Sequence, residues 1–97
     1  MTTGQFVDTN KPLIITFDNA KRLANLAKHG LDLAALDVDF FANAIVGSAR
    51  APRMVAIGRL ADGKVVTVIF ARLGSEALSV ISMRRSNRKE RNRLNGP

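Results

Sequence analysis

The sequence predicts an α+β domain in which helices pack against an antiparallel sheet. Apolar residues recur at helical spacing between residues 19 and 41, the pattern changes to strands from Ala44 onward, and a helix cap with a charged segment follows the last strand. With 97 residues the chain can bury one core but not two. We therefore expect one domain over residues 13–97, preceded by a flexible lead-in over residues 1–12.

A strand and two helices are expected in the first half. The strand covers residues 13–17 (LIITF), and Asp18 can cap a helix over 19–29 that Gly30 ends. The apolar side of this helix is formed by Ala20, Leu23, Ala24 and Ala27. Its wetter side is formed by Lys21, Arg22, Asn25 and Lys28. Asp32 can cap a second helix over 33–41, which ends near Asn43 and has an apolar stripe of Leu33, Leu36 and Phe40.

Four strands in a meander and a short terminal helix are expected in the second half. The strands cover residues 44–48, 53–60, 64–72 and 76–84. Asp62-Gly63 is a strong hairpin signal, and Gly74-Ser75 marks the next turn. Asn87 and Glu90 stand three apart as a capping box for a helix over 88–94.

The turns also predict a register for the meander. If both hairpins have two-residue loops, Arg59 lies opposite Val66 and Val66 lies opposite Met83. Arg85 then shares the face of Arg59, two strands and roughly 10 Å away, whereas Arg84 points to the other face. Such a pair of guanidinium groups has the spacing of a phosphate-binding cleft.

The composition points to an anionic partner and excludes several classes of protein. The net charge is +7, and residues 84–93 alone carry +5, so the basicity is local. Ten of the fifteen basic residues are arginines, which suit bidentate contacts with phosphate. The chain has no cysteine and one histidine, so we expect no disulfide, metal site or cofactor. It lacks a membrane-length apolar run and a signal peptide, so a cytoplasmic protein without membrane contact is expected.

Three blocks of sequence resemble the BrnT family of type II toxins in order and spacing. They are FDNAKRLANLAKHGLDL, AIGRLADGKVVTVIFA and VISMRRSNRKER, and together they span about Phe17 to Arg91. The resemblance implies a RelE-like fold and a ribonuclease that inhibits translation. It also implies a cognate DNA-binding antitoxin, BrnA-like, and a homodimer within the toxin–antitoxin complex as a further expectation. The chain departs from the family pattern at Phe17, where tryptophan is usual, and at Leu94, near the place of a tyrosine.

Metal-free RNA cleavage uses the 2′-hydroxyl of the substrate as nucleophile, so the protein must move protons and stabilise a dianionic transition state. An imidazole changes its charge near neutral pH, which makes His29 the candidate for proton transfer. We expect the catalytic residues to be His29, Arg59 and Arg84. Further RNA-binding residues are expected to be Lys28, Arg85, Arg88, Lys89 and Arg91.

Other interpretations of the same residues stay open. Lys28 and His29 could simply offset a helix dipole, Arg59 could be a solvated strand-edge charge, and the segment 88–93 could be a solvated helix face. The protein could be a non-catalytic RNA-, DNA- or antitoxin-binding module, or a domain that docks an acidic protein. The phenylalanines are expected in the core, without exposed aromatic residues that would stack on bases. The edge of the strand 44–48 could pair with a second subunit or an antitoxin segment.

Overall fold

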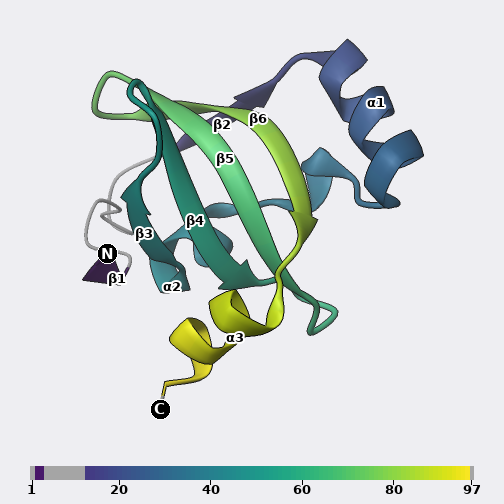
Figure 1. Cartoon of the computed structure of the whole chain (residues 1–97). Helices are drawn as coiled ribbons and strands as arrows, with labels where there is room; N and C mark the ends of the chain where they lie inside the picture. Colours follow the sequence, from purple (N-terminus) through teal and green to yellow (C-terminus); the bar gives the residue numbers. More distant parts are fainter. Residues whose placement is uncertain (1, 4–12, 97) are drawn as a thin grey trace.

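The fold is a six-stranded sheet with helices at its ends and on both faces (Figure 1). The computed structural model describes residues 2–3 and 13–96. Its strands are β1 (Thr2–Thr3), β2 (Ile14–Phe17), β3 (Ile45–Ser48), β4 (Arg53–Arg59), β5 (Val65–Leu73) and β6 (Ala77–Arg85). Its helices are α1 (Asn19–His29), the 3-10 helix η1 (Leu33–Ala35), α2 (Val38–Asn43) and α3 (Arg88–Asn95). The strand order is β1-β3-β4-β5-β6-β2, antiparallel except for the parallel pair of β2 and β6.

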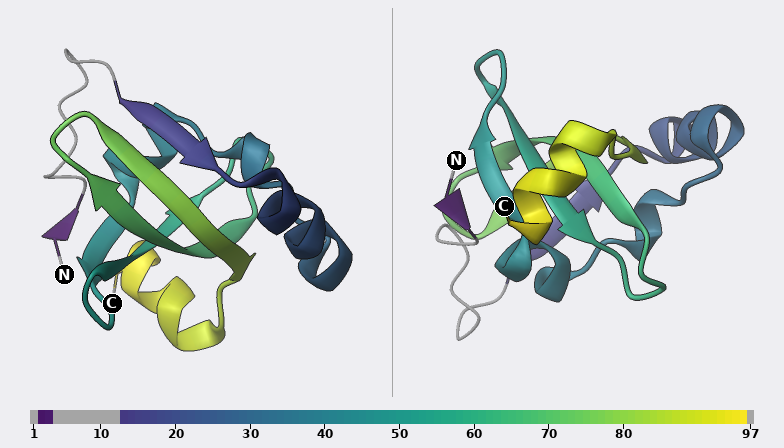
Figure 2. Two further views of the ribbon diagram at one scale, coloured as in Figure 1. Left: turned by 90° about the horizontal axis from the view of Figure 1, so that it is seen from above. Right: turned by 60° about the horizontal axis from the view of Figure 1, so that its bottom comes forward.

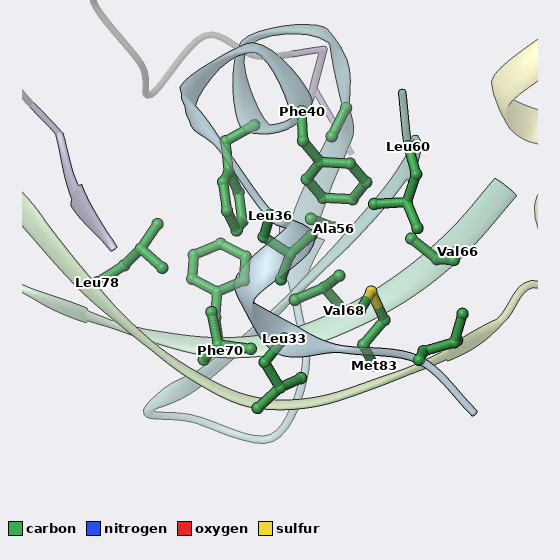
Figure 3. Close-up of a cluster of buried hydrophobic side chains, with 14 of the residues drawn as sticks. Leu33, Leu36, Phe40, Ala56, Leu60, Val66, Val68, Phe70, Leu78 and Met83 are labelled. Carbon is green, nitrogen blue, oxygen red and sulfur yellow. The ribbon is translucent and has the colours of Figure 1, made fainter. Parts of the chain in front are cut away.

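One face of the sheet carries the hydrophobic core (Figure 3). Alternate residues of β5 and β6 point into it, because side chains of a strand alternate between the two faces. The helical segment from η1 to α2 covers this face, and Phe41 contacts Phe40 and Phe70 edge-on at ring-centre distances of 5.1 and 5.3 Å. The buried residues include Leu33, Leu36, Phe40, Phe41, Ala56, Val66, Val68, Phe70, Leu78, Val80 and Met83. The predicted core role of phenylalanine is confirmed for Phe40, Phe41 and Phe70, and Phe17 packs against the core partly buried.

Most predicted helix boundaries are confirmed by side-chain caps. Asp18 Oδ1 accepts a hydrogen bond from the Ala20 amide, and Gly30 ends α1 in the left-handed conformation with φ 68°. Asn87 and Glu90 form the predicted capping box of α3. The predicted continuous helix over 33–41 is wrong. Leu36 is extended, and Asp37 caps a new helix by accepting from the Phe40 amide, so the segment divides into η1 and α2.

The predicted register of the meander is also wrong. The β5–β6 loop has three residues, 74–76, and the β4–β5 loop has three residues, 61–63, beyond the backbone hydrogen bond from the Leu60 amide to the Lys64 carbonyl. Ile81 is an extra residue in β6 opposite the step from Ile69 to Phe70. Arg59 therefore pairs with Val65, and Val66 pairs with Arg85. Arg59 shares its face with Arg84 rather than with Arg85, because the β4–β5 pairing is shifted by one residue, which reverses the face, whereas the β5–β6 pairing is shifted by two, which keeps it.

The two edge strands of the sheet, β1 and β2, come from the start of the chain. The predicted strand 13–17 is confirmed as β2, which adds to β6 in parallel. Within the predicted lead-in 1–12, Thr2–Thr3 form β1 and pair with Ile45–Val46 of β3, the strand whose edge was expected to meet a partner. Residues 4–12 lie outside the described residues. In the described part of the chain, no helix is long and apolar enough to cross a membrane.

The apolar side predicted for α1 is wrong. Asn25, predicted on the wetter side, is the buried residue of the helix, whereas Ala20, Leu23, Ala24 and Ala27 are exposed. The reason is the position of α1. It packs against the edge of β6 and against η1, where unpaired backbone groups favour a polar inner side.

Gly58 is required where α2 meets the sheet. A Cβ atom at this position of β4 would lie 2.7 Å from Phe40 Cε2 and 3.1 Å from Ala44 Cβ. We expect Gly58→Ala to lower the free energy of unfolding by about 1 to 3 kcal/mol through overpacking. Urea denaturation measures this change. Combining it with Phe40→Leu should recover part of the loss, and strictly additive effects of the two changes would contradict the contact.

Candidate functional site

Asn25 joins α1 to the open edge of β6. Strand β2 ends where Phe17 pairs with Val80, so the next residues of β6 have no strand on that side. Asn25 Oδ1 accepts a hydrogen bond from the Met83 amide at 3.0 Å, and its Nδ2 donates to the Leu31 carbonyl at 3.0 Å. Its side chain is buried, with 6% of the residue exposed. These two bonds hold the second half of α1 beside residues 81–83.

This arrangement creates a cavity lined by cations between α1 and β6. Its volume is about 230 Å³, and its walls are formed by Lys21, Ala24, Asn25, Lys28, His29, Ile81 and Ser82. The lining includes two lysines and the imidazole but no carboxylate. Two of the predicted site residues, Lys28 and His29, are thereby brought together. Ile81, the extra residue of the bulge in β6, lies in its wall.

Arg84 lies on the same strand and the same sheet face as Ser82. These residues pair with Thr67 and Ile69, which alternate along one face of β5. The Arg84 guanidinium donates to both carboxylate oxygens of Glu90, at 2.7 and 2.9 Å. This contact, with the Asn87 amide as a further donor, holds the pKa of Glu90 at about 2, below its ordinary value. It also raises the pKa of Arg84. Arg84 is thus charged and held in one orientation.

Arg59 lies in a different cavity from His29. That cavity has a volume of about 510 Å³ and lies between α2, the β4–β5 hairpin and the end of α3. The guanidinium donates to the Gly63 carbonyl at 3.2 Å and to Asn95 Oδ1 at 2.8 Å. Asp37 and Asp39 line the same cavity, so it is not uniformly basic. The structure therefore places Arg59 on the face of Arg84 but does not bring it together with His29 in one cavity.

The other predicted phosphate contacts lie on α3 and at the end of β6. Helix α3 lies at the lower end of the sheet in Figure 1, where it contacts β4. Arg88 and Lys89 are exposed in its first turn. Arg91 donates to the Ser86 carbonyl at 2.6 Å, at the junction with β6. Arg85 is exposed on the opposite face of β6 from Arg84.

Four residues of this region were not predicted as site residues. Lys21 and Ser82 line the cation cavity, Asn25 positions it, and Glu90 orients Arg84. The sequence does contain a signal for Asn25, because asparagine is a poor helix former inside an otherwise alanine- and lysine-rich helix. Among the described residues, no group of three or more histidine, aspartate or glutamate side chains could hold a metal ion.

Comparisons with known proteins agree with this architecture. The family described as "Ribonuclease toxin, BrnT, of type II toxin-antitoxin system" matches residues 17–90. The crystal structure of the Brucella abortus ribonuclease toxin BrnT is similar, with 47% sequence identity and a TM-score of 0.74. The match covers 78% of this chain and 99% of the Brucella chain. A comparison with curated proteins finds no match.

Asn25 can be tested by removing one or both of its hydrogen bonds. Asn25→Ala leaves the Met83 amide and the Leu31 carbonyl without their partner, and we expect a loss of about 2 kcal/mol or more in unfolding free energy. Asn25→Asp keeps an acceptor for Met83, but it buries a carboxylate and turns one of its oxygens towards the Leu31 carbonyl oxygen, so its loss at neutral pH should be at least as large. Chemical denaturation at neutral pH compares them. Equal stability of wild type and Asn25→Ala would contradict this role.

Glu90 predicts a pH dependence of stability. Its pKa is about 2 in the folded protein, so the stabilisation is fully present above about pH 4.5 and is lost as the pH falls towards 2. Glu90→Gln can still cap α3 but cannot pair ionically with Arg84. Because the Arg84 side chain is 45% exposed and screened, we expect a loss of only about 1 kcal/mol at pH 7. Urea unfolding at pH 7 and pH 3 should show this difference shrinking. An equal difference at both pH values would argue against an ionic contribution.

Proposed function

Because this chain belongs to the BrnT family of ribonuclease toxins of type II toxin–antitoxin systems, we propose that it cleaves RNA without a metal ion and so inhibits translation. The cleavage proceeds by attack of the substrate's 2′-hydroxyl on the adjacent phosphorus. A cognate DNA-binding antitoxin, BrnA-like, neutralises the protein in the cytoplasm, and two copies of the toxin assemble within the complex.

The observation that carries this proposal is the cation cavity, together with Arg84, which lies two residues from the cavity residue Ser82 on the same face of β6. Lys21, Lys28 and His29 face it without a carboxylate in its walls. A phosphodiester carries one negative charge, and the transition state of its cleavage carries two, so nearby ammonium groups stabilise the transition state more than the ground state. Arg84 adds a guanidinium group on the same face of the sheet as Ser82, and its ion pair with Glu90 orients this group.

We propose the following role for each residue. His29 moves a proton between the 2′-hydroxyl and the leaving 5′-oxygen, because an imidazole can do both near neutral pH. Lys28 and Arg84 hold the phosphate oxygens. Arg59, at the far end of α3, holds a more distant part of the RNA and influences the cleavage rate through binding. The exposed cations Arg85, Arg88, Lys89 and Arg91 contact the flanking backbone.

A binding function without cleavage is the second candidate. It is favoured by the separation of Arg59 from His29 into two cavities, which leaves fewer charges at one phosphate. The two functions differ in their products. Cleavage yields 2′,3′-cyclic phosphate ends, whereas the binding module retains intact RNA.

The experiment is an incubation of the purified protein with a structured RNA in EDTA. We expect cleavage with 2′,3′-cyclic phosphate ends, and a decrease in rate of about 100- to 1,000-fold for His29→Ala and for Arg84→Ala. Arg84→Lys should recover only part of the rate, because lysine keeps the charge but lacks the two-pronged guanidinium. Arg59→Ala should weaken RNA binding more than it slows the bound complex.

Arg50→Ala is the matched control, because Arg50 is exposed near the β3–β4 turn, away from both cavities. It should retain the wild-type rate. Circular dichroism checks that each variant is folded. Intact RNA in EDTA that is cut after addition of Mg²⁺ would overturn metal independence, and full activity of His29→Ala would remove the imidazole from the mechanism.

A further inference from the structure

The outer side of α1 is an apolar stripe without a partner in the described part of the chain. Ala20, Leu23, Ala24 and Ala27 follow the spacing with which a helix normally packs on a core, yet all four are exposed and Leu23 is 55% exposed. Both Figure 1 and Figure 2 show why, since α1 projects beyond the β6 edge of the sheet. The stripe therefore points away from the core.

The inner side of α1 is held by polar contacts, so the exposure of the stripe is built into the fold. Asn25 bonds to β6 and to the Leu31 carbonyl. Arg22 pairs with Asp32 through Nε and Nη2, at 2.8 and 2.9 Å. Rotating the helix to bury Leu23 would break these bonds and would place Asn25 in solvent. No segment among residues 2–3 and 13–96 covers the apolar stripe, so it is available to a partner molecule.

The charge beside the stripe restricts what that molecule can be. Helix α1 contains no acidic residue, and Lys21, Lys28 and His29 are exposed along it. A second copy of α1 would bring the two lysines face to face with those of the first copy, and the same charges attract a helix with acidic flanks. A helix with an apolar stripe and acidic residues on either side matches both features of this surface.

We propose that the outer side of α1 is the docking surface for an acidic amphipathic helix of the antitoxin, centred on Leu23. Ala24 belongs both to the stripe and to the wall of the cation cavity, where it lies between Lys21 and Lys28. A helix with side chains is about 10 Å wide, so one that is seated on the stripe and extends over Ala24 reaches the lysine side of the cavity, beside Lys21 and Lys28. Binding of the antitoxin helix would then also block access of RNA to the cavity. This inference rests on the proposed ribonuclease function.

The first test replaces Leu23, which lies outside both cavities. Leu23→Gln keeps a good helix former but removes the apolar group that the partner would bury, and we expect about 10- to 100-fold weaker binding of the purified cognate antitoxin. RNA cleavage and thermal stability should be unchanged. Leu73→Gln is the matched control, because Leu73 is 51% exposed on the β5–β6 hairpin. Calorimetric titration measures both affinities.

The second test uses a change with opposite effects on folding and docking. Ala20→Glu places a carboxylate in the first turn of α1, where it favours the helix, but beside the acidic partner, which it repels. We expect antitoxin binding about ten-fold weaker or worse, with unchanged or higher thermal stability. Misfolding therefore cannot explain a loss of binding in this variant.

The outcomes separate this proposal from the proposed function. Weaker binding in Leu23→Gln and Ala20→Glu, with normal binding in Leu73→Gln, supports the docking surface even if the wild type does not cleave RNA. Wild-type affinity in both α1 variants would overturn it, as would an equal loss in Leu73→Gln. Sedimentation that shows a toxin dimer dissociated by Leu23→Gln, with antitoxin binding intact, would assign the stripe to a second copy and overturn it too.

Discussion

The two hydrogen bonds of Asn25 decide how the first helix meets the sheet. The edge of a strand leaves backbone amides and carbonyls without hydrogen-bond partners, and such groups must find other partners where they are buried. After β2 ends, Asn25 supplies the acceptor for Met83 and takes the Leu31 carbonyl as its own partner. Lys28 and His29, one turn further along the same helix, are thereby held beside β6. The cation cavity depends on a side chain to which the proposed mechanism gives no chemical role.

The terminal helix depends on ionic and polar contacts in a similar way. Glu90 caps α3 and pairs with Arg84, while Asn95 at the other end accepts from Arg59. The arginines that the proposed function assigns to RNA are thus also the groups that attach α3 to the sheet. Because a guanidinium has five N–H donors in a fixed plane, these contacts leave donors available while restricting where the group can point. The same contact stabilises the fold and presents a charge.

The orientation of α1 is therefore the reverse of that expected for an amphipathic helix. Its polar side faces the protein, since the edge of a strand needs hydrogen bonds there. Its apolar side faces solvent, between cations that belong to the proposed site. An inhibitor that covers this side would bury apolar surface and neutralise charge together. Separate surfaces for docking and catalysis would need a conformational change to achieve the same inhibition.

The sequence by itself determined the features that depend on neighbours along the chain. The caps at Asp18 and Asn87, the left-handed stop at Gly30 and the strands of the meander follow from local backbone chemistry. The family can be recognised from three blocks of sequence by their order and spacing, without a structure.

The tertiary structure decided the register between paired strands and the side of each helix that is buried. One added residue in the β4–β5 loop placed Arg59 on the face of Arg84 and not of Arg85. The added residue of the β5–β6 loop and the bulge at Ile81 together shifted the pairing of β5 with β6 by two residues, which leaves the faces unchanged. The position of α1 at a strand edge reversed its expected inner side and separated His29 from Arg59. Local propensity carries no information about these choices, because side-chain direction changes with each residue of register and helix burial depends on what lies opposite.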